Sequence, residues 1–351
     1  MGKVIVLEGP RAIGFEEYPD RPLEPREVRI RTLYSGISAG TELTAYRGSN
    51  VYLHKQWDAG RRLFLPTETP AKQYPVRDLG YEEVGEIVEA GGEVSRVKVG
   101  DLVYGTWGHR THHIATEEYA AARLLPAGLE PILGIYSHMI AIALNGILDA
   151  AVRLSETAAV FGLGVPGQIV AQMAKRSGAT VIGVDLIEAR LAKAVELGAV
   201  DYPLDARAGQ IAERIKGLTE GRGADVCIEA SGAYPALHEA IRAAAYSAKV
   251  VALGFFQGPG MGLDLGEEFH HNRINLVCSQ IGGVGPELSY RWNRDRLVRT
   301  GMRLQAEGVL RLRPLITHVV PWEEAAAAFR MLDQEPGAAL QVVLDFTGES
   351  R

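Results

Sequence analysis

Short apolar runs without polar alternation recur along the chain from about Glu156 onward. Such runs are typical of parallel strands that are covered on both faces of a sheet. The segments between them carry apolar residues at three- and four-residue spacing, which indicates helices. The expected strands are 157–161, 180–185, 225–229, 249–253 and 275–279, and the expected helices are 165–177, 189–197, 210–217 and 236–245. This alternation predicts an α/β fold with a doubly wound parallel sheet of about six strands.

The first part of the chain, up to about residue 150, has a different pattern. Strand-like runs at 4–7, 28–32 and 101–104 are short and are broken by clusters of Gly and Pro. Short strands separated by such turn residues are typical of an all-β domain. Near the C-terminus, 322–332 has the periodicity of an amphipathic helix, and 338–346 that of a strand. The pattern therefore predicts two domains of different class.

Segment 131–148 contains no Asp, Glu, Lys or Arg over 18 residues. That length is close to the ~20 apolar residues that cross a bilayer. Small or polar residues nevertheless recur through it at intervals of three and four, which gives a helix one polar stripe. The stripe consists of Gly134, His138, Ala141, Asn145 and Asp149. We therefore expect a helix buried between two domains, with its stripe facing a cleft, and no membrane span.

Gly162, Gly164 and Gly167 stand between the first expected strand of the parallel sheet and its first helix. At this spacing, glycines permit a tight turn, a close approach of the backbone to a pyrophosphate, and close packing of the helix on the sheet. Val165 and Pro166 complete the loop. The alternative is a glycine turn in an α/β fold that binds no nucleotide. The whole strand–loop–helix–strand unit favours a dinucleotide site.

Asp185 ends the next expected strand. An acid at this point accepts hydrogen bonds from the adenosine ribose hydroxyls and repels the extra phosphate of NADP. Arg190 is a nearby cation that could meet that phosphate. The sequence therefore predicts NAD as the cofactor.

Composition narrows the classes of function. The 351 residues include 37 Lys plus Arg and 43 Asp plus Glu, with no block of like charge, so the pattern of a nucleic-acid binder is missing. Cys227 and Cys278 are the two cysteines, both in apolar runs, which is typical of a reduced compartment. The first ten residues lack a signal-peptide pattern. We expect a cytoplasmic protein that acts on a small molecule.

Four motifs occur in the order found in the medium-chain dehydrogenase/reductase superfamily, which the chain resembles from end to end. They are GYEEVGEIV at 80–88, VKVGDLV at 97–103, GLGVPG at 162–167 and VCIEASG at 226–232. The resemblance implies a GroES-like catalytic domain at 1–149, an inserted Rossmann NAD-binding domain at 150–284, and a return to the catalytic domain at 285–351. It also implies a cleft for nicotinamide and substrate, cofactor contacts that include Ser231 and Gly254, and a homodimer or homotetramer.

The zinc-binding pattern of the superfamily is incomplete in this chain. In its zinc alcohol dehydrogenases, a Cys, a His, and a further Cys or acid hold the catalytic metal. The matching positions fall on Ser38 or Ala39, on Tyr81, and on or beside His138. Two cysteines also cannot supply the four-cysteine structural zinc lobe. The chain thus resembles a zinc-lacking branch, close to bacteriochlorophyllide-type and sugar or polyol dehydrogenases, and we expect no metal.

Alcohol oxidation without zinc needs another way to remove the hydroxyl proton, because bound zinc lowers the pKa of water from ~15.7 to ~7. A positioned base is the usual solution. The candidates for the chemistry are Ser38, Tyr81, Glu82 and His138, with Thr41 as a relay hydroxyl. His112 and His113 are candidates for substrate contact.

Other interpretations of these residues stay open. His138 could be a hydrogen-bonded core histidine, Glu82 a structural charge, and the two loop histidines polar residues of a β edge. His138, Glu82 and a loop histidine could also form an improvised zinc site, since imidazole and carboxylate bind zinc.

Three functions are compatible with these features. The favoured one is NAD-dependent hydride transfer to or from a secondary alcohol of a polyol or sugar-like compound. The second is a quinone or enone reductase, which Asp185 disfavours because such enzymes usually take NADPH. The third is a non-catalytic NAD-binding protein.

Overall fold

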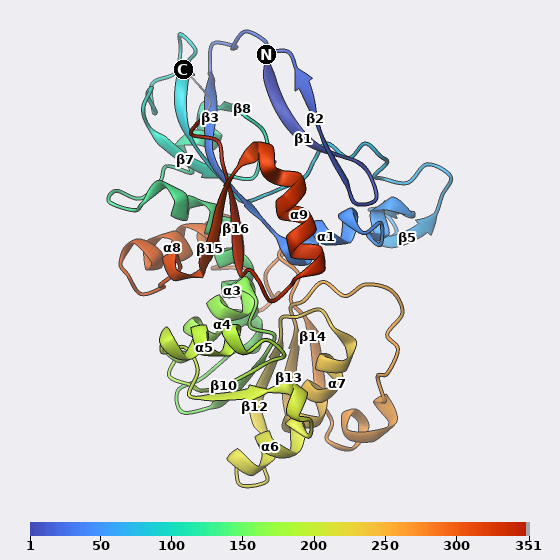
Figure 1. The fold of residues 1–351 in the computed structure, drawn as a ribbon. Helices are drawn as coiled ribbons and strands as arrows, with labels where there is room; N and C mark the ends of the chain where they lie inside the picture. Colours follow the sequence, from blue (N-terminus) through green and yellow to red (C-terminus); the bar gives the residue numbers. More distant parts are fainter. Residues whose placement is uncertain (349–351) are drawn as a thin grey trace. The chain divides into compact units, whose positions relative to one another are not determined.

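The structure is a computed structural model that describes residues 1–348 of the chain (Figure 1). It divides into two compact units. Unit one comprises Met1–His138 and the chain from Ile316 onward, and unit two comprises Met139–Leu315. Each unit has its own hydrophobic core.

Unit two contains a six-stranded sheet in the order β11-β10-β9-β12-β13-β14, in which every neighbouring pair is parallel. Its strands are β9 (Thr157–Phe161), β10 (Thr180–Asp185), β11 (Tyr202–Asp205), β12 (Ala224–Glu229), β13 (Ala244–Ala252) and β14 (Asn275–Cys278). The order reverses at β9 and β12, so the sheet is doubly wound as predicted. Every residue of β9 after Thr157 is buried, as expected for a central strand with both faces covered.

The helices of unit two follow their strands in turn. They are α3 (Ser137–Ala150, whose first two residues belong to unit one), α4 (Val165–Arg176), α5 (Glu188–Glu196), α6 (Ile211–Leu218), α7 (Tyr234–Ala243) and α8 (Arg294–Ala306), with short turns η3 (Ala206–Ala208) and η4 (Leu265–Phe269). Helices α4 and α5 pack on β9, β10 and β11, whereas α7 packs on β9, β12 and β13. Because α6 and α7 share one core cluster with the central strands, they cover the same face of the sheet.

Unit one is mainly β, as the sequence predicts. Its largest sheet has the order β15-β16-β3-β6-β7, with β8 also paired to β3. The strands are β3 (Glu27–Ile37), β6 (Glu83–Ala90), β7 (Leu102–Gly105), β8 (His112–Thr116), β15 (Ile316–Pro321) and β16 (Gln341–Asp345). Two hairpins complete it, β1 (Gly2–Gly9) with β2 (Ala12–Tyr18) and β4 (Lys55–Asp58) with β5 (Leu63–Pro66).

The helical elements of unit one lie at the ends and edges of these sheets. They are α1 (Ala39–Tyr46), α2 (Glu117–Ala121) and α9 (Ala325–Gln334), with single turns η1 (Val51–Leu53), η2 (Pro131–Tyr136), η5 (Arg313–Leu315, assigned to unit two) and η6 (Trp322–Glu324). Helix α9 packs against α1. Its apolar face joins β1 and β16 in one core cluster around Phe329, which is fully buried.

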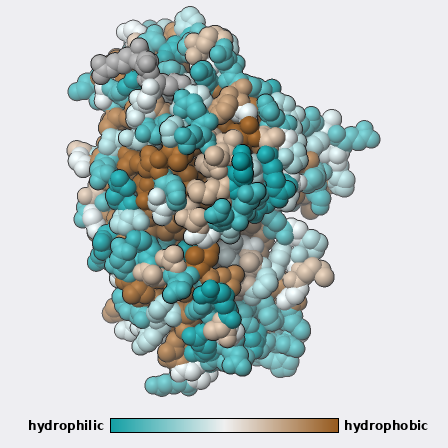
Figure 2. Space-filling model, in the orientation of Figure 1, coloured by the Kyte–Doolittle hydropathy of each residue, from teal (hydrophilic) through white to brown (hydrophobic). Residues whose placement is uncertain are grey.

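The apolar segment near residue 140 is a 3₁₀ turn, η2, that continues into α3. By length and composition, Pro131–Ala150 could cross a membrane, but 78% of its most apolar window is buried inside the protein. The face of the molecule in Figure 2 is mostly hydrophilic, with hydrophobic patches between the polar areas.

The unit boundaries differ from the expected ones at 149/150 and 284/285. The structure divides the chain after His138 and after Leu315. Packing explains the second difference, because α8 belongs with unit two: a Cβ at Gly301 would lie 1.9 Å from Ile140. The chain after α8 stays in unit two as well, since Arg311 N donates to Gln172 Oε1 at 2.8 Å.

Candidate functional site

The loop after β9 has two glycines that the protein's own packing requires. Gly162 has φ +87°, and a Cβ there would lie 2.7 Å from Ser231 Cβ. A Cβ at Gly167 would lie 1.8 Å from the carbonyl oxygen of Gly162. Both contacts are too short for any side chain, so these glycines close the turn and bring α4 against the strand.

Gly164 is different, because its surroundings are open. The nearest atom to a Cβ at this position would be Arg190 Nη1, at 4.0 Å. Gly164 is the N-cap of α4 and provides no side-chain cap, so the backbone N–H groups of the first turn, which Pro166 lacks, receive no side-chain acceptor from it. Exposed N–H groups and the helix dipole favour an anion at such a terminus. The loop thus fits the pyrophosphate of a dinucleotide. The space beside Gly164, which a side chain at this position would occupy, is open to that group.

Asp185 connects two loops at the carboxyl end of β10. Its Oδ2 accepts a hydrogen bond from Leu163 N at 2.6 Å, and its Oδ1 accepts one from Ile187 N at 2.8 Å. Arg190 lies mostly buried nearby. Burial lowers the pKa of its guanidinium, and the charge of Asp185 partly opposes that shift. Asp185 therefore supports the glycine loop in addition to its predicted contact with ribose.

Glu229, which the sequence analysis did not single out, organises the loop after β12. Its carboxylate accepts hydrogen bonds from Ser231 N at 2.8 Å and from Gly232 N at 3.0 Å. Gly254 packs against the same loop, since a Cβ there would lie 2.2 Å from Gly232 N. The predicted cofactor residues Ser231 and Gly254 thus lie on two adjoining loops, and Ser231 lies beside Gly162.

Four of the residues predicted for catalysis come together in unit one. The Ser38 hydroxyl makes a short hydrogen bond with the Tyr81 hydroxyl, which also donates to Thr41 Oγ1 at 3.1 Å. The His138 ring lies edge-on to the Tyr81 ring, with centroids 4.9 Å apart. Thr41, Tyr81 and His138 are partly exposed, whereas Ser38 is buried. We call Ser38, Thr41, Tyr81 and His138 the hydroxyl cluster.

The electrostatics of this cluster restrict its chemistry. Burial raises the pKa of the Tyr81 phenol, and the charge of Glu82 raises it further, so Tyr81 stays protonated at neutral pH. A protonated phenol donates hydrogen bonds and does not act as a base. Tyr81 is therefore suited to orient a substrate oxygen, which leaves His138 as the basic group of the cluster.

Glu82 lies behind the cluster and is fully buried. Burial raises the pKa of its carboxyl well above the ordinary range, and the charges of Glu42 and Glu83 raise it further. Within residues 1–348, no donor reaches its oxygens in good hydrogen-bonding geometry, although Ser38 and Gln341 lie near enough to lower that pKa in part. A fully buried carboxyl is out of a substrate's reach, which favours the structural interpretation of Glu82.

The structure does not bring His112 and His113 to the hydroxyl cluster. They lie on β8, where His113 pairs with Ile30 of β3, and Ser38 follows the opposite end of that strand. Eight residues of strand correspond to roughly 26 Å. The His113 ring stacks on Trp107, and burial lowers the pKa of His113 to about 4. Their predicted contact with substrate has no support from this placement.

The loop that carries them holds a histidine that the sequence analysis missed. His109 is fully buried, its Nε2 lies 2.7 Å from Glu42 Oε2, and its Nδ1 lies 2.7 Å from Ser35 Oγ. Ser35 Oγ donates to Glu83 Oε1 at 3.0 Å. Sequence offered little signal here, because Glu42 and His109 are 67 positions apart.

The hydroxyl cluster does not fit a zinc ion. Zinc in proteins is held by thiolate, imidazole and carboxylate. The cluster offers one imidazole, from His138, and three hydroxyls, of which the Tyr81 phenol has a raised pKa. Within the described part of the chain, no group of three or more His, Cys, Asp or Glu could hold a metal ion.

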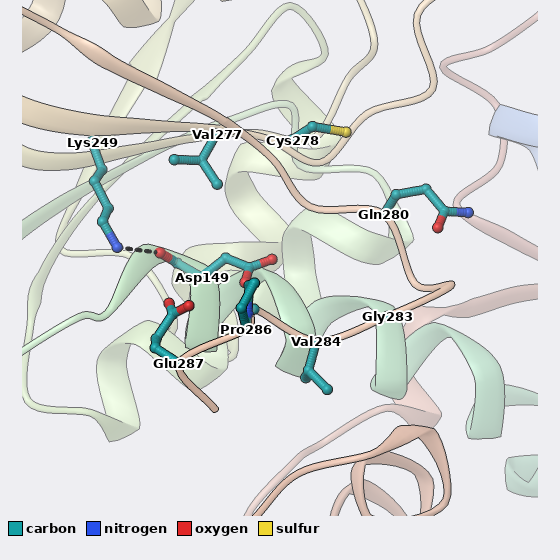
Figure 3. Close-up of a pocket in the computed structure, with 10 residues that line it drawn as sticks. Asp149, Lys249, Val277, Cys278, Gln280, Gly283, Val284, Pro286 and Glu287 are labelled. Carbon is teal, nitrogen blue, oxygen red and sulfur yellow. Dashed lines mark hydrogen bonds between the residues drawn. The ribbon is translucent and has the colours of Figure 1, made fainter. Parts of the chain in front are cut away.

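Unit two also has a hollow of 290 Å³ beside β14 (Figure 3). Asp149, Lys249, Cys278, Gln280 and Glu287 line it, and Lys249 Nζ donates to the Asp149 carbonyl oxygen at 2.8 Å. Burial raises the pKa of the Asp149 carboxyl. None of the predicted site residues lines this hollow.

Comparison with known proteins gives two domain matches. Residues 24–175 match the alcohol dehydrogenase GroES-like domain, and residues 166–294 match the zinc-binding dehydrogenase domain. D-guloside 3-dehydrogenase of Shigella flexneri is 32% identical, covering 98% of this chain and all of that protein. Sorbitol dehydrogenase of Halalkalibacterium halodurans is 26% identical and covers 94% of each chain.

Solved structures agree on the fold. The crystal structure of 2R,3R-butanediol dehydrogenase from Bacillus subtilis superposes with a TM-score of 0.77, covering 98% of this chain and 99% of that one. Its sequence identity is 23%, so it bears on the fold alone.

Proposed function

The chain belongs to the medium-chain zinc-binding dehydrogenase family, and we propose that it oxidises a secondary hydroxyl of a sugar or polyol with NAD. The observation that carries this proposal is the hydroxyl cluster with one basic group, His138, beside a protonated Tyr81. The substrate class follows the relatives, which act on a D-guloside and on sorbitol by their names.

The proposed reaction divides between the two units. NAD, when bound, supplies the acceptor for the hydride that leaves the carbinol carbon. The glycine loop and Asp185 in unit two hold the dinucleotide. In unit one, Tyr81 and Thr41 orient the substrate oxygen, and His138 takes the hydroxyl proton. The products are a ketone, the reduced cofactor and one proton, so atoms and charge balance.

We also propose that this reaction runs without catalytic zinc. The family's zinc-binding members place metal ligands at positions that here carry Ser38 or Ala39 and Tyr81. A methyl group does not bind zinc, neutral hydroxyls bind it poorly, and those of Ser38 and Tyr81 are hydrogen-bonded to each other. A general base, His138, takes the place of the metal in this scheme.

The remaining expectations are part of the same proposal. We keep NAD over NADP because an acid at the end of this strand, here Asp185, would repel the extra phosphate of NADP. A cytoplasmic location and a homodimer or homotetramer are proposed for an enzyme of this kind.

A substrate panel tests the proposal. Purified protein is mixed with NAD and either a methyl D-guloside, sorbitol or 2,3-butanediol, and formation of NADH is followed by absorbance. We expect turnover with a sugar or polyol, less than one zinc per chain by elemental analysis, and unchanged activity after chelation. Stoichiometric zinc with activity lost on chelation and restored by zinc would overturn the metal-free scheme. Turnover of quinones with NADPH, and of no alcohol, would support the reductase alternative.

A further inference from the structure

His109 contacts two groups that hold the hydroxyl cluster: Glu42, which is bonded to Ser38, and the backbone of Leu79, which precedes Tyr81. On one side its Nε2 holds Glu42 Oε2 at 2.7 Å, and Glu42 Oε1 accepts a hydrogen bond from Ser38 N at 2.7 Å. On the other side His109 N donates to the Leu79 carbonyl oxygen at 2.9 Å, two residues before Tyr81. Ser38 and Tyr81 thus share one support.

The contact with the Tyr81 segment is close. Gly80 has φ +88°, and a Cβ there would lie 2.7 Å from the His109 ring. Gly108 has φ +82°, and a Cβ there would lie 2.7 Å from the Leu79 carbonyl oxygen. The backbone of Gly80 therefore lies directly against the His109 ring, and the backbone of Gly108 lies directly against that of Leu79. Because no side chain separates these groups, a shift of His109 moves the Gly80–Tyr81 segment.

The contact with Ser38 determines where the serine hydroxyl points. Ser38 is the N-cap of α1, and an N-cap serine normally accepts a hydrogen bond from the first turn of its helix. Ser38 makes no such bond. Glu42 instead reaches back to the Ser38 N–H from the N4 position, one residue beyond the glutamate of a capping box. The Ser38 hydroxyl is therefore available to Tyr81.

The hydrogen bonds around His109 favour a proton on both ring nitrogens. Ser35 Oγ donates its single proton to Glu83 Oε1, and in that arrangement it accepts from Nδ1–H. Nε2 faces a carboxylate of Glu42, which also accepts. Glu83 is fixed in turn by Trp107 N at 2.7 Å. Burial alone would lower the pKa of His109, but the Glu42 and Glu83 charges outweigh it and raise that pKa.

We propose that His109 is a positioning residue for the dehydrogenase reaction, which sets the Ser38–Tyr81 hydroxyl pair by holding Glu42 on one side and the Leu79–Gly80 backbone on the other. This inference rests on the proposed function. His109 itself has no solvent exposure, so its role is to position other groups and not to act on the substrate directly.

Two substitutions of His109 distinguish the contribution of Nε2 from that of Nδ1. In His109→Gln the amide nitrogen takes the place of Nε2 and keeps the bond to Glu42. In His109→Asn the shorter amide takes the place of Nδ1 and leaves Glu42 without its partner. We expect His109→Gln to keep kcat within about twofold. We expect His109→Asn to lose about 10²-fold in kcat, because a misplacement of about 1 Å has that cost. NAD affinity should stay unchanged in both.

A double-mutant cycle with Tyr81→Phe tests whether the effect passes through the hydroxyl pair. If His109 acts through Tyr81, His109→Asn costs little more in the Tyr81→Phe background. Additive losses, or equal losses in the Gln and Asn variants, would overturn the proposal, because either result is what a general destabilisation gives. Should His109→Asn fail to fold, Glu42→Asp replaces it: the shorter carboxylate cannot span Ser38 N and His109 Nε2.

A readout without turnover separates this inference from the proposed function. Protein labelled with ¹³C at the tyrosine Cζ gives one resonance for Tyr81, assigned by its loss in Tyr81→Phe. This resonance should shift in His109→Asn or Glu42→Asp and stay in place in His109→Gln. An unmoved resonance in the Asn and Asp variants refutes the positioning role. A shifted resonance in a protein that oxidises no alcohol refutes only the proposed reaction.

Discussion

The dinucleotide loop of unit two presents backbone to its ligand, whereas the hydroxyl cluster of unit one presents side chains. The loop needs glycines at 162 and 167, where a Cβ would collide with the protein, and at 164, where a Cβ would enter the space left for the ligand. The cluster needs Ser38, Tyr81 and His138, which come from three distant segments and depend on buried partners for their orientation.

This difference determines how each site fails. A backbone site is damaged by adding atoms, because a new Cβ blocks either the fold or the ligand. A side-chain site is damaged by removing atoms, either at the reacting groups or at their supports. Substitutions of both kinds therefore distinguish the two sites.

The largest effect should come from removing the reacting groups of unit one. His138→Ala should lower kcat on a verified substrate by about 10²–10⁴-fold, the usual contribution of a general base, and Tyr81→Phe by about 10²-fold, because the substrate oxygen loses the donor that orients it. NAD affinity should not change, since the dinucleotide residues lie in unit two. Steady-state kinetics and NAD titration measure both. Tyr119→Phe is the control, because its hydroxyl accepts only a hydrogen bond from Thr106 N that the cluster does not use. Full kcat in both cluster variants would rule out this proton route.

Adding a methyl group to the glycine loop should separate folding from binding. Gly167→Ala places a Cβ 1.8 Å from the Gly162 carbonyl oxygen and should destabilise the protein by about 1–3 kcal/mol. Gly164→Ala meets nothing closer than 4.0 Å and should keep the wild-type melting temperature. We expect it to weaken NAD binding by about tenfold, or ~1.4 kcal/mol. Calorimetry measures the melting temperature, and titration measures the affinity for NAD. An NAD affinity in Gly164→Ala equal to that of the wild-type protein would contradict the assignment of this loop to the pyrophosphate.

The same contrast explains what the sequence could predict. The six-stranded sheet and the glycine loop were predicted because they rest on local patterns: apolar runs of strand length and glycine spacing. The weakest strand signals were missed. β11 has four residues and contains Pro203, as an edge strand can, and β15 is an edge strand that alternates buried or half-buried with exposed residues.

The side-chain site could be predicted only in part. Ser38, Tyr81 and His138 were found through the positions of a family pattern, and the structure brings them together. Their support was not found, because His109 and Glu42 are far apart in sequence and nothing local marks them as partners. His112 and His113 were predicted to contact substrate, yet the β3–β8 register places them at the other end of the strand.

The buried carboxyl behind the cluster should make stability depend on pH. The pKa of Glu82 is raised in the folded protein, so folding binds a proton. Its contribution is therefore fully present below the unfolded pKa of ~4.3 and declines, by up to ~1.36 kcal/mol per pH unit, as pH rises through the folded pKa. The free energy of unfolding, measured with urea between pH 5 and pH 8, should therefore fall less steeply with pH in Glu82→Gln than in the wild-type protein. Glu86→Gln, on the same strand and paired with Arg31, is the control and should leave this decline unchanged.

The smallest effect should be a change of cofactor preference in unit two. Asp185→Ser removes the carboxylate that would repel the extra phosphate of NADP, while Arg190 remains to attract it. The same change removes two acceptors, for Leu163 N and Ile187 N, so the loop loses a support and NAD binding should weaken as well. We therefore expect the ratio of NAD to NADP affinity to fall by about fivefold, or ~1 kcal/mol. Titration of both cofactors against wild type and variant measures this ratio. Asp185→Asn is the matched control, because it retains an acceptor for Ile187 N while losing the charge; a fall of the ratio in Ser but not in Asn would assign the preference to loop geometry and not to charge.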